Sequence, residues 1–140
     1  MEPSDLIDLY LEKPYWVIDL LPQQVPADSQ GQYFNIEKHF LSQPQFADIC
    51  RKFANVLLML NCYYDFTVLN PPDMGVNPAP EQLVNWLTAG KALHVLIASE
   101  ESMIAFNGDD LYMTLYNPSK SLLQLITPLA LSEGLFVWKN

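Results

Sequence analysis

Residues 93–116 read LHVLIASEESMIAFNGDDLYMTLY, and this stretch decides the fold. It contains three apolar runs without a single Asp, Glu, Lys or Arg, at 93–98, 103–106 and 111–116. The linkers between them have the length and residue types of hairpin turns, and Asn107-Gly108 is the strongest short hairpin signal a sequence can carry. The stretch therefore predicts a three-stranded antiparallel meander.

Further elements lie on both sides of the meander. Runs of β-branched and aromatic residues predict three more strands, at 15–21, 63–69 and 135–138. Helical spacing of apolar residues predicts helices at 5–11, 33–40, 44–61, 79–89 and 118–132. We expect Ser42 and Gln45 to form a capping box for the third of these helices, the segment 22–32 to be a loop, and the last strand to insert into the sheet or to line its edge.

These elements predict one α+β domain covering residues 1–140. We expect a mixed or mostly antiparallel sheet of five to six strands, with the meander at its centre and the helices mainly on one face. A chain of 140 residues is long enough to enclose one hydrophobic core. No internal repeat divides it.

Charge is scarce and mostly negative. The 7 basic and 16 acidic side chains make up 16% of the chain, against about 25% in a typical soluble domain. The net charge of −9 is spread evenly, and Arg51-Lys52 is the only adjacent basic pair. A nucleic-acid partner and an anionic membrane surface are therefore not expected, whereas a basic protein partner suits this charge.

Localisation is inferred from the N-terminus and the cysteines. Glu2 and Asp5 stand where a secretory signal carries positive charge, and no long apolar run follows, so we expect a cytoplasmic protein. Cys50 and Cys62 are compatible with a reducing compartment. On one continuous helix they would lie about 18 Å apart, too far to form a disulfide.

Catalytic motifs are missing, so enzymatic activity stays uncertain and is the less favoured interpretation. A Cys/His nucleophile would need Cys50 or Cys62 beside His39 or His94, but Cys50 lies on an apolar helix stripe and is interpreted as a buried structural thiol. The histidines show no close ligand spacing. We therefore predict neither a metal site nor a cofactor.

Several carboxylates fall at informative positions. Glu100-Glu101 and Asp109-Asp110 occupy turns at opposite ends of one strand, so they cannot converge, and both pairs are interpreted as solubilising turn charges. Docking of a basic partner group on Asp109-Asp110 is the alternative. Asp19 and Asp65 interrupt apolar strand segments; we expect both to face water, and either would become a general-base candidate if it were buried in a cleft.

Aromatic residues are abundant on the predicted strands. Tyr112 and Tyr116 alternate with aliphatic residues, which predicts an aromatic sheet face that helices cover only partly. Aromatic side chains with polar tips are enriched at protein interfaces and in ligand clefts. The candidate partner-binding residues are Tyr112, Tyr116, Trp138, Trp16, Asp109 and Asp110.

The leading hypothesis is a non-enzymatic cytoplasmic protein-interaction module. It would associate with a second copy of itself or cap a basic partner, as an inhibitor or immunity protein does; that comparison is an analogy from size and charge. The alternative is a small-ligand-binding or enzymatic domain with a cleft near loops 22–32 and 70–80.

Overall fold

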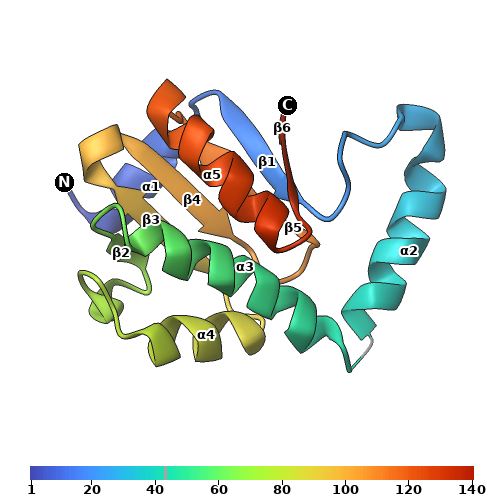
Figure 1. The fold of residues 1–140 in the computed structure, drawn as a ribbon, viewed down its shortest axis with the longest axis horizontal. Helices are drawn as coiled ribbons and strands as arrows, with labels where there is room; N and C mark the ends of the chain where they lie inside the picture. Colours follow the sequence, from blue (N-terminus) through green and yellow to red (C-terminus); the bar gives the residue numbers. More distant parts are fainter. Residues whose placement is uncertain (43) are drawn as a thin grey trace.

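A computed structural model describes residues 1–42 and 44–140 (Figure 1). Its strands are β1 (Tyr15–Asp19), β2 (Thr67–Asn70), β3 (Leu93–Ile97), β4 (Ser102–Phe106), β5 (Tyr112–Tyr116) and β6 (Phe136–Lys139). Its α-helices are α1 (Pro3–Leu11), α2 (Gln30–Ser42), α3 (Phe46–Asn61), α4 (Pro80–Thr88) and α5 (Lys120–Ser132). Three single-turn 3-10 helices complete it: η1 (Ala27–Ser29), η2 (Pro72–Met74) and η3 (Ala98–Glu100).

The strands form one antiparallel sheet in the order β2-β3-β4-β5-β1-β6. The predicted α+β class and the predicted meander are confirmed, because β3, β4 and β5 are consecutive neighbours within the sheet. β6 lies at the edge, which is one of the two places expected for the last strand.

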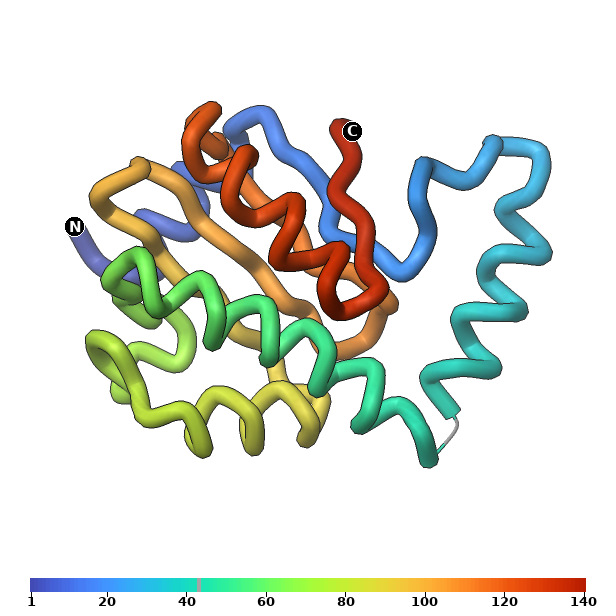
Figure 2. Tube along the Cα trace, viewed as in Figure 1, coloured from blue at the N-terminus to red at the C-terminus, as the bar shows by residue number. Residues whose placement is uncertain are grey.

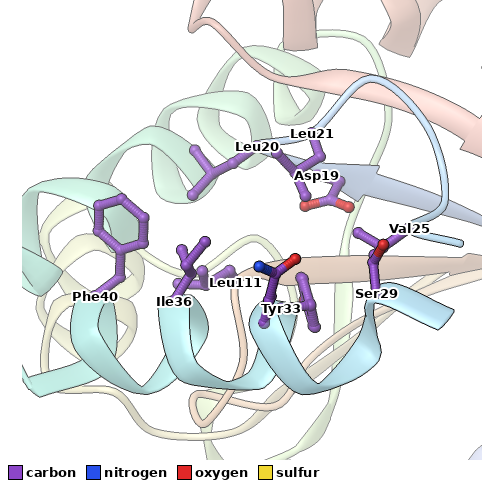
Figure 3. Close-up of a pocket in the computed structure, with 10 residues that line it drawn as sticks. Asp19, Leu20, Leu21, Val25, Ser29, Tyr33, Ile36, Phe40 and Leu111 are labelled. Atoms are coloured by element: carbon purple, nitrogen blue, oxygen red, sulfur yellow. The ribbon is translucent and has the colours of Figure 1, made fainter. Parts of the chain in front are cut away.

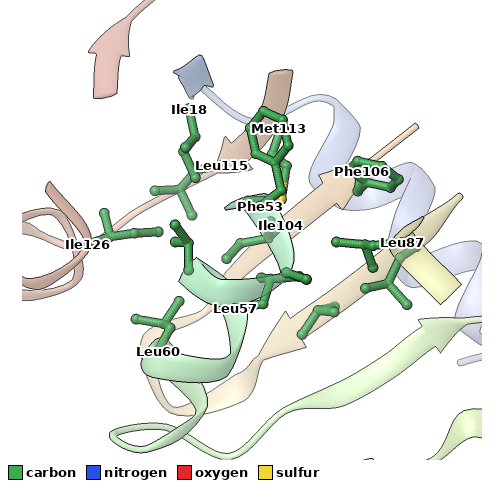
Figure 4. Packing of buried hydrophobic residues seen from close by; sticks show 14 of the residues in the cluster. Ile18, Phe53, Leu57, Leu60, Leu87, Ile104, Phe106, Met113, Leu115 and Ile126 are labelled. Carbon is green, nitrogen blue, oxygen red and sulfur yellow. The ribbon is translucent and has the colours of Figure 1, made fainter. Parts of the chain in front are cut away.

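The strand register divides the sheet into two faces. On the inner face, Ile18, Met113 and Leu115 pack with Phe53 and other residues of α3, as Figure 4 shows. Figure 1 shows α3 and α5 in front of this face. Fully buried apolar side chains fill the space between helices and sheet, so this is the core that stabilises the fold.

The outer face of the sheet is covered to different extents along its width. In Figure 1, α1 lies behind the sheet, and it contacts β2 and β4. Met103 and Ala105, which the register places on this face, are buried. Toward β1 and β6 the outer face carries aromatic side chains that are only half-buried, among them Tyr15, Tyr112 and Trp138.

Helix α2 stands beside the rest of the molecule (Figure 2). None of its thirteen residues is buried. Its contacts are few, and the most extensive of them are with η1 and α3. It begins at Gln30, so the predicted loop 22–32 is wrong in its second half: η1 starts the helical winding at Ala27 and α2 continues it. The loop that joins β1 to η1 is correspondingly short.

The predicted capping box at Ser42 is also wrong. Ser42 is the last residue of α2, and its hydroxyl donates to the His39 carbonyl at 2.8 Å instead of capping the next helix. α3 begins at Phe46 behind Gln45, whose side chain makes no capping bond. The Ser42 hydroxyl is thus already used by the helix that precedes it.

Two predicted strands are shorter in the structure. β2 starts at Thr67 and not at Tyr63, because the Asn61 side chain donates to the Tyr64 carbonyl at 3.0 Å and holds the chain in a turn after α3. β1 ends at Asp19, where the backbone N–H groups of Leu20 and Leu21 turn toward the Asp19 carboxylate.

Cys50 lies within α3 and Cys62 directly follows it, and both are free, which confirms that they do not pair. Cys50 is buried in the core and Cys62 is exposed. Across residues 1–42 and 44–140, no helix has both the length and the apolar character needed to span a membrane.

Candidate functional site

Two adjoining cavities separate α2 from the β1 end of the sheet. The first has a volume of about 240 Å³ and the second of about 320 Å³. They share Asp19, Val25 and Tyr33 as lining residues, so we treat them as one trough. The trough is the candidate site because it lies between the aromatic outer face of the sheet and α2, the helix that does not pack into the core.

The first cavity is almost entirely apolar. Figure 3 shows Tyr33, Ile36 and Phe40 of α2 on one side and Leu20 with Asp19 on the other. Ile36 remains 56% exposed and its neighbour Phe34 57% exposed. Such a group of uncovered large apolar side chains on one helix is typical of a surface that meets a partner.

The second cavity has the sheet as its floor. Val17 lies opposite both Thr114 of β5 and Trp138 of β6, and Asp19 lies opposite Tyr112. Tyr15 pairs with Tyr116, and their ring centroids are 5.6 Å apart. Since directly opposed residues bring their side chains together on one face, these strands build a floor in which aromatic rings surround Val17 and Thr114.

Asp19 is 5% exposed, so the prediction that it faces water is wrong. Strand alternation places it on the outer face, where aromatic side chains and α2 cover it. Burial raises the pKa of the Asp19 carboxyl, although hydrogen bonds from the Leu21 and Leu20 backbone and the nearby Trp138 indole partly oppose this. The buried Trp138 Nε1 lies close enough to the Asp19 carboxyl to lower its pKa, but too far or too misaligned to form a full hydrogen bond with it.

Asp110 is 9% exposed, so its interpretation as a solubilising turn charge is wrong. Its Oδ2 accepts a hydrogen bond from the Asn107 side chain at 3.1 Å, which holds the carboxylate against the protein. Its buried Oδ1 has no partner among the described residues, and burial raises the pKa of Asp110 to about 6. Asp109, its neighbour, is exposed as a turn charge should be.

Glu37 of α2 acts electrostatically on both Asp19 and Asp110. The Tyr33 hydroxyl donates to Glu37 Oε2 at 3.1 Å. Besides the effect of burial, the charge of Glu37 helps to raise the pKa of both Asp19 and Asp110. The charges that raise the pKa of these two carboxyls come from acidic neighbours, Glu37 for Asp19 and both Asp109 and Glu37 for Asp110.

Tyr112 lies near both buried carboxylates: it follows Asp110 by two residues and lies opposite Asp19 on the neighbouring strand. Burial, with Asp110 and Glu37 adding to it, raises the pKa of Tyr112 to about 12. Its hydroxyl therefore stays protonated over the whole physiological range and remains available as a hydrogen-bond donor.

The structure brings together most of the predicted site residues. Tyr112 and Trp138 line the trough, Tyr116 lies beside Tyr15 on the same face, and Asp110 is close enough to act on Tyr112. Trp16 does not join them, because it lies opposite Leu115 and packs against the core on the inner face.

Sequence reasoning missed the contribution of α2. Tyr33, Ile36 and Phe40 have ordinary helical spacing, which predicts an apolar face without saying what covers it. Phe34, a large aromatic residue directly beside that stripe, was the available signal for an unusual surface.

The other candidate groups do not reach Asp19. Asp65 is exposed, as predicted, and accepts a hydrogen bond from Asn77. His94 is on β3, beside Asn70 of β2 and separated from β1 by the two strands β4 and β5, and burial lowers its pKa. His39 lines a separate cavity between α2 and α3.

Nucleophilic and metal chemistry find little support. Burial raises the pKa of the Cys50 thiol to about 11, which keeps it protonated and inert. Within residues 1–42 and 44–140, no three His, Cys, Asp or Glu side chains gather closely enough to hold a metal ion. Loop 70–80 lines a different cavity, beside Trp86 and Lys91, so the two loops that were expected near one cleft border separate cavities.

The chain matches no protein-family model, and comparison with the curated proteins and with the solved structures gives no significant match.

Proposed function

We propose that this chain is a non-enzymatic protein-interaction module that binds a basic, partly apolar segment of a partner protein in the trough. The observation that carries the proposal is the combination of uncovered apolar side chains on α2 with the buried Asp19 carboxylate on the facing strand β1. An inhibitor or immunity protein, which caps a basic surface of its target, would work in this way.

The charge of the whole chain supports the same kind of partner. A net charge of −9 attracts a basic protein over a distance and speeds its association. The trough then offers apolar contact area, which supplies affinity that long-range charge alone does not. We place the encounter in the cytoplasm, where the two free cysteines would stay reduced.

The test uses synthetic peptides and the indole N–H of Trp138. The chain has three Trp, so Trp138→Phe assigns the signal in a ¹H–¹⁵N spectrum. Titration with acetyl-Leu-Arg-Phe-Lys-Leu-amide is expected to shift this signal in a saturable way, because Trp138 lines the trough. The acidic counterpart, acetyl-Leu-Glu-Phe-Glu-Leu-amide, is expected to leave it unchanged. Equal shifts from both peptides, or none from either, would contradict the proposal.

A matched pair of variants separates the trough from the overall charge. Glu37→Gln and Glu81→Gln each remove one negative charge, but Glu37 accepts a hydrogen bond from Tyr33, which lines the trough, whereas Glu81 is exposed at the start of α4. We expect the first variant to weaken binding of the basic peptide severalfold and the second to leave it nearly unchanged. Equal losses would mean that net charge, and not the trough, attracts the peptide.

A small-ligand site is the second candidate function, and the apolar cavity of about 240 Å³ beside the Asp19 carboxylate favours it. Hexylammonium carries the same charge and enough apolar chain to fill this cavity alone. If it binds as tightly as the basic peptide, the small-ligand function is supported. If the peptide binds markedly tighter, contacts along a partner chain account for the difference.

Self-association is the remaining alternative, because α2 could meet a second copy of the chain. Light scattering distinguishes the two: the proposal expects a mass near 16.0 kDa in the absence of a partner. A dimer that Phe34→Ser converts to a monomer would instead assign the exposed face of α2 to contact between copies.

A further inference from the structure

The two edges of the sheet differ in what covers them. At the β2 edge the chain covers itself, because the Val68 N–H donates to the Gly75 carbonyl at 2.9 Å. The Asn77 N–H likewise donates to the Phe66 carbonyl at 2.8 Å. At the other edge, β6 contacts mainly β1 and α5, and α5 lies on the inner face (Figure 1). In the part of the chain that the structure describes, no second strand pairs with β6.

The strand register shows which backbone groups of β6 are left free. The Asn140 N–H donates to the Tyr15 carbonyl at 3.4 Å, and in an antiparallel pair such bonded positions alternate with unbonded ones. The backbone N–H and C=O of Trp138 therefore point to β1, whereas those of Val137 and Lys139 point away from it. Within residues 1–42 and 44–140, these outward groups make no backbone hydrogen bond to another segment. β6 thus offers a free ladder edge to an extended peptide.

The free edge of β6 adjoins the trough. Trp138 and Asn140 line the second cavity together with Gln24 and Val25 of the loop before α2. Side chains of a strand alternate between its two faces, so every second side chain of a strand added to β6 would share the face of Trp138. We therefore expect apolar residues at alternate positions of the bound segment.

Charge favours a basic partner over a second copy of the chain as the occupant of this edge. Among the described residues that line the trough, Asp19 is the only charged one. Two copies that each carry a net charge of −9 repel one another, whereas a basic segment is attracted. The exposed Lys139 disfavours a basic residue directly opposite it. The basic residues are therefore expected on either side of the paired stretch.

We propose that the bound segment is an extended peptide that pairs with the free edge of β6 as a seventh, antiparallel strand and turns alternate apolar side chains toward the trough. All strand pairs of the sheet are antiparallel, so the added strand continues the existing arrangement. This inference rests on the proposed function and names the conformation and the hydrogen-bond partners of the segment that the trough binds.

The test uses the heptapeptide acetyl-Arg-Leu-Thr-Phe-Thr-Leu-Arg-amide. With its Phe opposite Trp138, its two Thr lie opposite Val137 and Lys139. The Thr N–H groups then point to β6, whereas the Phe N–H points away. N-methylation of either Thr is expected to weaken binding about tenfold, and N-methylation of the Phe to change it less than about twofold, measured by calorimetric titration.

Hydrogen exchange locates the pairing on the protein. The amide protons of Val137 and Lys139 are expected to exchange about tenfold more slowly when the heptapeptide is bound, because they gain hydrogen-bond partners. The amide proton of Trp138 already bonds to β1 and serves as the internal control, so its exchange should change little.

Two variants of Lys139 separate the backbone from the side chain. Lys139→Pro and Lys139→Ala both remove the exposed ammonium, but only the proline also removes the outward N–H. Edge strands tolerate proline where the N–H faces solvent. We expect the proline variant to bind the heptapeptide about tenfold more weakly than the alanine variant does. Equal affinities would contradict pairing at β6.

The outcomes separate the two proposals. If the heptapeptide shifts the Trp138 indole signal but N-methylation of Phe costs as much affinity as N-methylation of Thr, strand pairing is overturned while the proposed function stands. The same holds if only the basic pentapeptide binds. If neither peptide binds, both proposals fail. Protection of the Val137 and Lys139 amides without peptide, in a dimer by light scattering, would assign the edge to a second copy and overturn the inference.

Discussion

The helices α2 and α3 follow each other along the chain, yet the fold uses them in opposite ways. Both carry apolar residues at helical spacing. In α3, six residues are buried and form the middle of the core; in α2, none is. The comparison teaches that an amphipathic pattern predicts a covered face, but what covers it is decided by the rest of the molecule.

The energetic consequence differs accordingly. Apolar area that α3 buries against the sheet stabilises the folded state by about 25 cal/mol per Å². The large apolar side chains of α2 stay exposed to water and contribute little to stability. They remain available to a ligand, which is why the same residue types support the fold in one helix and the proposed binding in the next.

The largest expected effect is the loss of stability when a buried α3 side chain is truncated. Phe53→Ala removes a side chain that is 1% exposed and lies 6.2 Å from the Phe106 ring, centroid to centroid. We expect the free energy of unfolding to fall by about 3–5 kcal/mol, measured by denaturant titration. Phe40→Ala in α2 is the matched control and should cost less than about 1 kcal/mol. Similar losses from both would show that α2 belongs to the core.

A glycine pair extends the same comparison to the backbone. Gly108 has a φ of +86°, and a Cβ there would overlap the Gly90 carbonyl, so Gly108→Ala should lower the free energy of unfolding by about 2–3 kcal/mol. Gly31 lies in α2 with open space around it, and Gly31→Ala should raise stability by about 0.5–1 kcal/mol. A tolerated Gly108→Ala, seen as an unchanged thermal midpoint, would rule out the close approach of the two loops.

The buried carboxyl of Asp110 predicts a pH dependence of intermediate size. Burial raises its pKa from 3.8 to about 6, and the nearby charges of Asp109 and Glu37 act in the same direction. The folded state therefore holds the proton more tightly than the unfolded state, so this group makes stability fall as the pH rises from about 4 to about 6. Allowing for partial hydration, the loss is on the order of 1–2 kcal/mol.

Asp110→Asn checks this dependence, because the amide cannot titrate. Denaturant titrations at several pH values should show a flatter profile for the variant than for the parent chain. Asp109→Asn, which alters an exposed neighbour, should keep most of the slope. If the parent profile is flat over this range, Asp110 is hydrated and the burial described above does not hold in solution.

The strands were predictable because their signals are local. Apolar runs bounded by Asn107-Gly108 and similar turn residues leave few alternatives, and alternation along 111–116 correctly placed Tyr112 and Tyr116 on one face. Trp16 was harder, since residues 15–19 are apolar on both faces apart from Asp19. Only pairing with β5 shows that Trp16 faces the core and Tyr15 the trough.

The trough itself could not be predicted, because it depends on long-range placement. Asp19 and Asp110 looked like hydrated charges, and they are buried only because separate parts of the chain come together around them. No local pattern encodes the position of α2. The composition did indicate a neutral, aromatic sheet surface near carboxylates, but not the helix that turns it into a cavity.

The smallest expected effect on stability is the one that most directly tests the role of α2. Phe34 is 57% exposed and lines the trough, so Phe34→Ala should change the free energy of unfolding by less than about 0.5 kcal/mol while weakening binding of the basic peptide severalfold. Tyr63→Ala is the matched control, because Tyr63 is an equally exposed aromatic residue after α3, outside the trough. It should alter neither stability nor binding. If Phe34→Ala leaves peptide affinity intact, or if Tyr63→Ala weakens it as much, the exposed apolar face of α2 has no part in recognition, and its contrast with α3 reflects only incomplete packing.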